Sequence, residues 1–312
     1  MELRKDYILD RWVIISEDRG KRPKEFVKDT IHELDVCAFC PGNESLTPPE
    51  IGRIGTPTWQ VRWFENKYPF VKQEGTSMIE THNHFFTFSN PYGHHEIIVE
   101  TPDHKKQLAA LTEEQITMVL KAYCDRINKL SKEPSVMYVQ VFKNSGREAG
   151  TSLVHSHSQV AAYNLLPTLI QEEVNVSKKF TSCPYCAIIQ TEKKSFRRIF
   201  ENEHFVSFAP YASRFNYEAW IFSKAHVKNI TDMNDEQLSG LAQVLKKILG
   251  RLAELGLPYN YFLHNAPVDQ DLHFHIEICP RKAIWGGFEL ATDTYVNSVS
   301  PETAASFYRG ES

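Results

Sequence analysis

The 312-residue sequence lacks a long apolar run and has no excess of positive charge. A membrane-spanning helix needs about 18 or more consecutive apolar residues, and no segment reaches that length. The formal net charge of -4 argues against general binding to nucleic acid. The first residues also lack the apolar centre of a signal peptide. We therefore expect a soluble globular protein of the cytoplasm, with neither membrane nor nucleic acid as a partner.

Cysteine is scarce, but four of the six cysteines form two tight pairs. The pairs are Cys37-Ala38-Phe39-Cys40 and Cys183-Pro184-Tyr185-Cys186. In a reducing compartment, two cysteines separated by two residues favour a metal knuckle over a disulfide. Redox-active pairs are the alternative. The two single cysteines, Cys124 and Cys279, lie in apolar patterns and are expected in the core.

Short motifs recur in the same order along the chain. His104 is matched by His226, and His155-Ser156-His157 is matched by His273-Phe274-His275. Each half shows an apolar strand, a lone histidine, an amphipathic helix and further strands. We predict a duplicated module with halves at 1–170 and 171–312. Few strands alternate with helices, which favours an α+β fold with a helix-backed antiparallel sheet.

The histidines that follow each cysteine pair complete two possible metal sites. Two sulfurs and two imidazoles form the donor set that tetrahedral zinc prefers. Because four protein ligands leave no open position for water, we expect both sites to be structural. Buried, hydrogen-bonded histidines are the alternative. The predicted ligands are Cys37, Cys40, His104 and His155 in the first half, and Cys183, Cys186, His226 and His273 in the second.

The His-Ser-His-Ser-Gln segment carries the predicted chemistry. On a strand, His155, His157 and Gln159 would share one face. His157 is then free to attack phosphorus, with its attacking nitrogen kept unprotonated by a backbone carbonyl on the other nitrogen. A loop rich in small residues, with Asn144, Gly150 and Ser152, can bring donors close to phosphate oxygens.

Gln159 distinguishes between two reactions. An amide can donate a hydrogen bond to a phosphate oxygen, but it cannot supply the proton that a hydrolase expelling an amine or alkoxide needs. A sugar phosphate leaves without such help, because the second pKa of a phosphate monoester is about 6. The pattern therefore favours nucleotidyl transfer between phosphates over hydrolysis, and it shows no need for magnesium.

Over nearly its whole length the sequence resembles the galactose-1-phosphate uridylyltransferase family, the transferase branch of the histidine-triad superfamily. The family's His-x-His-x-Gln matches His155, His157 and Gln159, which implies a zinc ligand, the nucleophile and an intermediate-binding amide. The resemblance also implies two tandem histidine-triad-like modules, each half of a barrel, and a homodimer. The implied substrate contacts are Arg19, Arg22, Asn66, Asn144, Gly150, Ser152, Phe288 and Glu289. Without the family, Arg19 and Arg22 would be read as solvated charges.

Some residues depart from the family pattern. Ser156 replaces the usual proline between the histidines, and near the C-terminus only Glu289 of three hexose-contacting residues is kept. The second cysteine pair and the serines of the His-Ser-His-Ser-Gln segment are similar to the plant ADP-glucose phosphorylase branch. In the second half, Glu277 stands where Gln159 stands in the first, so we expect His275 to be structural or to line the sugar side of the site.

The expected reaction is a two-step exchange through a nucleotidyl-histidine. It moves a nucleoside monophosphate from a nucleotide sugar to hexose 1-phosphate, as UDP-glucose–hexose-1-phosphate uridylyltransferases do. Adenylyl transfer to inorganic phosphate is the main alternative. A histidine-triad hydrolase and a non-catalytic nucleotide-binding protein are two further alternatives.

Overall fold

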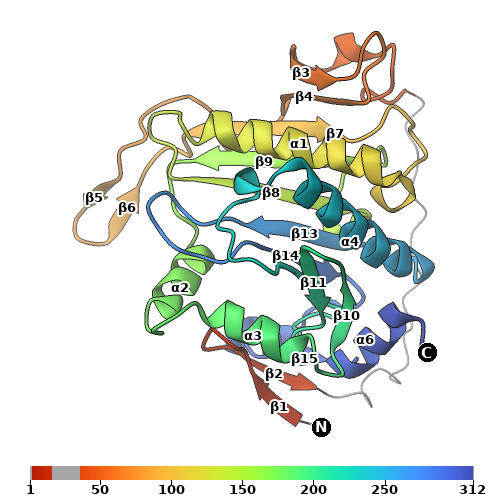
Figure 1. Cartoon of the computed structure of the whole chain (residues 1–312). Helices are drawn as coiled ribbons and strands as arrows, with labels where there is room; N and C mark the ends of the chain where they lie inside the picture. The colour runs from red at the N-terminus through yellow and green to blue at the C-terminus, as the bar shows by residue number, and fades with distance from the viewer. Residues whose placement is uncertain (1, 16–35, 312) are drawn as a thin grey trace.

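The computed structural model describes residues 2–15 and 36–311. In this part of the chain, ten strands form one antiparallel sheet in the order β10-β11-β12-β14-β13-β8-β9-β7-β4-β3 (Figure 1). The first half contributes β3 (Glu50–Ile54), β4 (Val61–Glu65), β7 (Gly93–Val99), β8 (Tyr138–Ser145) and β9 (His157–Tyr163). The second half contributes β10 (Arg198–Glu201), β11 (Phe205–Phe208), β12 (Ala219–Ser223), β13 (Tyr259–His264) and β14 (His275–Pro280).

The connectivity of the sheet confirms the duplication seen in the sequence. In the first half β9 lies between β7 and β8, and in the second half β14 lies between β12 and β13. A long helix follows the first strand of each trio, α1 (Glu113–Leu130) after β7 and α4 (Asp235–Glu254) after β12. β13 pairs with β8, so the two copies share one continuous sheet. The predicted division at residue 170 falls inside α2 (Thr168–Ser177) and stays a prediction.

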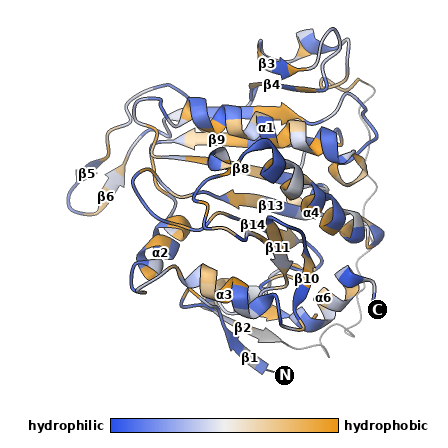
Figure 2. Ribbon diagram, in the orientation of Figure 1, coloured by the Kyte–Doolittle hydropathy of each residue, from blue (hydrophilic) through white to orange (hydrophobic). Residues whose placement is uncertain are grey.

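The two long helices lie side by side across one face of the sheet (Figure 1). The core lies between them and the strands, where the helical stripes expected from the sequence are buried together with Val141 and Val160 of the sheet. Figure 2 shows the central strands mostly hydrophobic and both helices banded, as expected for helices with one solvated side. No helix within the described ranges is long and apolar enough to span a membrane.

The N-terminal ends of the two helices are capped differently. Asn234 and Gln237 cap α4 reciprocally, each side chain accepting from the other's backbone N–H. At α1, Thr112 accepts from the backbone N–H of Gln115, but the Gln115 side chain donates to the carbonyl of Glu100 instead. A capping box is therefore only half formed at α1, because the Gln115 side chain tethers the helix to the end of β7.

Smaller elements cover the rest of the sheet. A three-stranded sheet joins the two ends of the chain, and an exposed hairpin projects from the first half (Figure 1). The three-stranded sheet is β1 (Glu2–Lys5), β2 (Trp12–Ile15) and β15 (Tyr295–Asn297), and the hairpin is β5 (Glu80–His82) and β6 (Phe86–Phe88). The other α-helices are α3 (Pro184–Glu192), α5 (Gly287–Thr292) and α6 (Pro301–Arg309).

Candidate functional site

A cavity of ≈ 710 Å³ lies where β8 ends and β9 begins. Its size is within the range of about 300–1,000 Å³ typical of small-molecule sites. The loop between the two strands lines it, and this loop turns at Gly150, whose positive φ of 89° suits a residue without a side chain. Of the predicted site residues, Asn144, Ser152, His155 and His157 line this cavity.

In the imidazole of His157, one ring nitrogen carries a proton and the other does not. Its Nδ1 lies 2.8 Å from the carbonyl oxygen of His155. A carbonyl can only accept, so Nδ1 carries the proton and Nε2 keeps its lone pair. Burial, reinforced by the positive charge of Lys143, lowers the pKa of His157 to about 4. The imidazole is therefore neutral at physiological pH, with Nε2 able to act as a nucleophile.

Gln159 lies on the same face of β9 as His157, as the strand alternation predicts. Its side-chain oxygen lies 2.8 Å from Nε2 of His95, on the neighbouring strand β7. Asn66 reaches the same imidazole, with its amide nitrogen 3.4 Å from Nδ1 of His95. Gln159 and Asn66 are thus joined through one buried histidine, although neither lines the cavity itself.

Asn144 lines the cavity, and a hydrogen bond fixes the orientation of its side-chain amide. Its oxygen accepts from Asn260 of β13 at 2.8 Å, and Asn260 also donates to the carbonyl of Ala149. The side chain of Asn144 is thereby left with its nitrogen as the group that can donate to a ligand. Ser152 lies on the same loop, two residues beyond Gly150.

Four of the predicted substrate contacts that the structure describes, Asn66, Gly150, Phe288 and Glu289, do not line this cavity. Phe288 and Glu289 lie on α5, which packs against β15, and neither lines the cavity around His157. The carboxylate of Glu289 accepts from the backbone N–H of Gly286 and caps its own helix. Arg19 and Arg22 lie outside the described residues.

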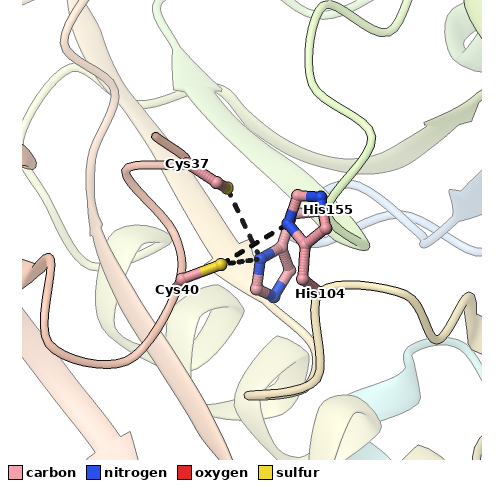
Figure 3. Close-up of side chains that lie close together, drawn as sticks. All are labelled: Cys37, Cys40, His104 and His155. Atoms are coloured by element: carbon pink, nitrogen blue, oxygen red, sulfur yellow. Dashed lines mark hydrogen bonds between the residues drawn. The ribbon is translucent and has the colours of Figure 1, made fainter. Parts of the chain in front are cut away.

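The first predicted set of metal ligands converges, as Figure 3 shows. Cys37 Sγ lies 3.6 Å and Cys40 Sγ 3.7 Å from Nδ1 of His155, and Cys40 Sγ lies 3.4 Å from Nδ1 of His104. A tetrahedral ion with bonds of about 2.3 Å to sulfur and about 2.0 Å to nitrogen would separate such atoms by about 3.6 Å. These four residues could hold a metal ion.

The hydrogen bond of Nε2, the His155 nitrogen that faces away from the cysteines, also suits a metal-binding histidine. Its Nε2 lies 2.7 Å from the carbonyl oxygen of Thr101, so this nitrogen carries the proton. Nδ1 therefore points its lone pair at the two cysteines. Metal-bound histidines usually donate their other N–H in this way, which fixes the ring.

The second set repeats this arrangement. His273 Nδ1 lies 3.8 Å from Cys183 Sγ and 3.5 Å from Cys186 Sγ, and His226 Nδ1 lies 3.6 Å from Cys186 Sγ. The outer nitrogens have acceptors as well, because His226 contacts the Asp271 carboxylate and His273 contacts the Ser223 carbonyl, both at 2.8 Å. This group could also hold a metal ion.

One expectation about the motif is wrong in detail. His155 was expected on the same strand as His157, but β9 begins only at His157. His155 lies in the loop, where its ring turns toward Cys37 and Cys40. Nδ1 of His157 donates to the His155 carbonyl, and the two rings face different surroundings.

In the second half, the position equivalent to His157 is closed off. His275 is fully buried, and the ring of Phe222 stacks on it at 4.6 Å. Glu277, which replaces the glutamine, is paired with Arg214. His264 is not at the surface either, since it pairs with Glu173 at 2.8 Å in the core.

Three residues of this region were missed at the sequence level. His95 was not singled out, although it shares a face with Ile97 and Val99 and hence with Gln159 and His157. Glu100 and Lys143 were not singled out, yet they form a buried ion pair next to His157. A charged residue at the end of each buried strand was the available signal.

Comparison with known proteins places the chain in a family. The galactose-1-phosphate uridyl transferase N-terminal domain matches residues 1–167, and the C-terminal domain of the same family matches residues 139–290. The chain therefore belongs to the galactose-1-phosphate uridylyltransferase family. It is an enzyme, a nucleotidyltransferase.

Two relatives in this family are similar over almost their whole length. ADP-glucose phosphorylase of Arabidopsis thaliana is 34% identical, over 99% of this chain and 92% of the relative. Galactose-1-phosphate uridylyltransferase of Thermotoga maritima is 31% identical, over 98% and 96%. The crystal structure of an Arabidopsis thaliana ADP-glucose phosphorylase with bound ADP-glucose superposes with a TM-score of 0.85 at 32% identity, covering 100% of this chain and 99% of that chain. A uridylyltransferase structure gives a TM-score of 0.79 at 28% identity, over 100% and 98%.

Proposed function

We propose that His157 carries a nucleotidyl group between two phosphates. The observation that supports this most directly is the unprotonated Nε2 of a neutral, cavity-lining His157. In the first step this nitrogen attacks the α-phosphorus of a nucleotide sugar. The bond from that phosphorus to the bridging oxygen breaks, and hexose 1-phosphate leaves with the electron pair. In the second step a phosphate oxygen of the acceptor attacks the phosphorus and releases His157. No proton has to be transferred in either step.

Donors near His157 would stabilise charge on the phosphoryl oxygens. The amide nitrogens of Gln159 and Asn144 have their oxygens already engaged, so they are oriented to donate. Ser152 and the backbone around Gly150 lie on the same loop. We propose Arg19 and Arg22 as further phosphate contacts, and Asn66 as a nucleoside contact.

We propose zinc at both cysteine–histidine groups. Two thiolates and two imidazoles at tetrahedral separations form a closed site, which is typical of structural zinc. Zinc would lend the fold stability and fix ligand geometry. The first group includes His155, whose carbonyl orients His157, so this group also supports the active site.

The first candidate reaction is uridylyl transfer from UDP-glucose to a hexose 1-phosphate such as galactose 1-phosphate, which would place the protein in galactose metabolism. The family resemblance implies Glu289 as a hexose contact, and most of the similar curated proteins carry this activity in their names.

The second candidate is adenylyl transfer from ADP-glucose to inorganic phosphate. It is favoured by the relative that is 34% identical and by the similarity to the structure with bound ADP-glucose. The second cysteine pair and the serines of the His-Ser-His-Ser-Gln segment agree with this alternative.

We also propose that the protein acts in the cytoplasm as a homodimer. Phe288 and Glu289 do not line the cavity of their own chain, so contacts from them to the same substrate would require a second copy. The hairpin of β5 and β6 also exposes large apolar side chains, among them Phe85 and Phe86. Exposed apolar patches of this kind are common at subunit interfaces.

Intact-mass analysis tests the proposal. The enzyme is incubated separately with UDP-glucose, UDP-galactose and ADP-glucose, with no acceptor present. We expect one nucleotidyl group to be added per chain, with a mass that identifies uridine or adenosine, and peptide mapping should place it on His157. The His157→Gly variant is the control and should bind the same nucleotide sugar without forming an adduct. Steady release of free mononucleotide from the wild-type enzyme would instead indicate a hydrolase.

A further inference from the structure

We infer that the buried ion pair between Lys143 and Glu100 positions His157 for attack. This inference rests on the proposed function of His157. Lys143 Nζ lies 2.6 Å from Glu100 Oε2, and both side chains are almost completely buried. The same ammonium donates to the backbone carbonyl of His157 at 3.0 Å and to Ser156 Oγ at 3.1 Å. Its three N–H groups thus have three acceptors, and one of them is the main chain of His157.

The carboxylate holds the residues on both sides of His157. Ser156 Oγ donates to one oxygen of Glu100 at 2.5 Å, and Ser158 Oγ donates to the other. Tyr123 of α1 contacts Ser158 from the helix side. Burial raises the pKa of Glu100, but Lys143 and the serine hydroxyls lower it more, so the carboxylate is charged at neutral pH.

The strand order explains why this pair can hold the nucleophile. Lys143 lies on β8, and Glu100 follows directly after β7. The strand β9, which begins at His157, lies between β8 and β7. The ion pair therefore connects the two neighbours of β9. It holds residues 156–158 through hydrogen bonds to one carbonyl and two hydroxyls. Ser158 points to the helix-covered face of the sheet and His157 to the opposite face.

This arrangement accounts for a feature that the proposed reaction leaves unexplained. The proposed reaction needs no particular residue at position 156 or 158, yet both are serines bound to one carboxylate. Apolar residues could fill this volume, often with equal or better stability than a buried ion pair. The direct contacts with the residues around the nucleophile indicate a positioning role.

The test replaces the pair by apolar residues, in the double variant Lys143→Met/Glu100→Leu, so that no unpaired charge is left. Misplacing a reacting group by about 1 Å can cost about 100-fold in rate. We expect the single-turnover rate of His157 nucleotidylation and kcat to fall by about 100-fold, while KM for UDP-glucose or ADP-glucose changes by less than about 3-fold. Adding the double variant to His157→Gly should leave nucleotide-sugar affinity within about 2-fold of His157→Gly alone.

A second buried ion pair provides a matched control. Arg126 binds Glu96 of the same strand β7 through two contacts of 2.7 Å, and both are almost completely buried. These hydrogen bonds between Arg126 and Glu96 do not involve residues 155–159. The variant Arg126→Met/Glu96→Leu should therefore change stability to a comparable extent and leave the rate of nucleotidylation within about 3-fold of wild type. Urea unfolding measures the stability of both double variants.

Three results would overturn the inference. One is an unchanged rate in Lys143→Met/Glu100→Leu, and another is an equal loss of rate in the Arg126→Met/Glu96→Leu control. The third is a loss of nucleotide-sugar affinity in the His157→Gly background, which would mean that Lys143 acts on the substrate. If the double variant does not fold, Ser156→Ala is used, for which we expect a 3- to 10-fold lower rate at unchanged KM, and an unchanged rate would again refute the inference. Failure of the proposed function is a different result, because the wild-type enzyme would then form no adduct.

Discussion

His95 fixes the orientation of the Gln159 side chain. The backbone N–H of Phe70 donates to Nδ1 of His95 at 3.4 Å, so the proton of the neutral ring lies on Nε2. Nε2 then donates to the side-chain oxygen of Gln159 at 2.8 Å. Burial lowers the pKa of His95, although the bond with Gln159 partly opposes this, so the ring is neutral at physiological pH. The amide nitrogen of Gln159 therefore remains available to donate a hydrogen bond to a phosphate oxygen.

The substitution His95→Phe should therefore slow nucleotidyl transfer. It keeps an aromatic ring against Phe70 but removes the donor, so Gln159 can rotate its oxygen toward the phosphate. A hydrogen bond of this kind contributes about 0.5–1.5 kcal/mol, so we expect kcat to fall by about 2- to 12-fold with little change in KM. His94→Phe, on the opposite face of the same strand, is the control and should retain the wild-type kcat. Equal losses in both variants would argue for a packing effect.

The two metal groups should differ in their effect on activity. Cys40→Ser and Cys186→Ser should each lose one equivalent of bound zinc and lower the melting temperature. Of these two cysteines, only Cys40 contacts His155, whose backbone carbonyl orients the ring of His157. We therefore expect a 10- to 100-fold loss of the exchange rate in Cys40→Ser and a loss of less than about 3-fold in Cys186→Ser. Zinc is measured by elemental analysis on the same samples used for kinetics. Comparable losses of activity in both variants would show that the metals act only through overall stability.

The sequence predicted the local parts of this site well. The spacing of the cysteine pairs and the repeated histidines led to eight predicted ligands, and the structure brings these residues together in two groups. The strand alternation placed His157 and Gln159 on one face. These features depend on periodicity and on residue chemistry, both of which are visible along the chain.

Contacts between distant segments were not predictable in the same way. The bond from His95 to Gln159 depends on the register of β7 against β9, and the ion pair of Lys143 with Glu100 depends on β9 lying between β8 and β7. A shift by one residue would turn either side chain to the other face. The strand start at His157 was also missed, since the bend that turns the His155 ring toward the cysteines has no sequence signal of its own.

The core pair of His264 and Glu173 predicts a pH dependence of stability. Burial lowers the pKa of His264, but the Glu173 carboxylate, assisted by Glu277 and opposed by Arg214, raises it above the ordinary value of 6.5. Because the folded protein then holds this proton more tightly, the pair stabilises the fold fully below pH 6.5 and loses its contribution as pH rises through the folded pKa. The free-energy difference between wild type and Glu173→Gln, from urea unfolding, should therefore shrink between pH 6 and pH 8.5. A difference that grows with pH would contradict this assignment.

Replacing the equivalent histidines of the two copies, His157 and His275, should affect catalysis differently. Burial lowers the pKa of His275 to about 3, and its Nε2 has no hydrogen-bond partner among the residues described. The ring is completely buried and stacks on Phe222, so His275→Phe exchanges one buried aromatic ring for another. We expect a change in unfolding free energy of less than about 1.5 kcal/mol and an exchange rate within about 2-fold of wild type. His157→Phe should abolish the covalent adduct, because it removes the attacking nitrogen. Loss of the adduct in His275→Phe at unchanged stability would mean that the second copy takes part in the reaction.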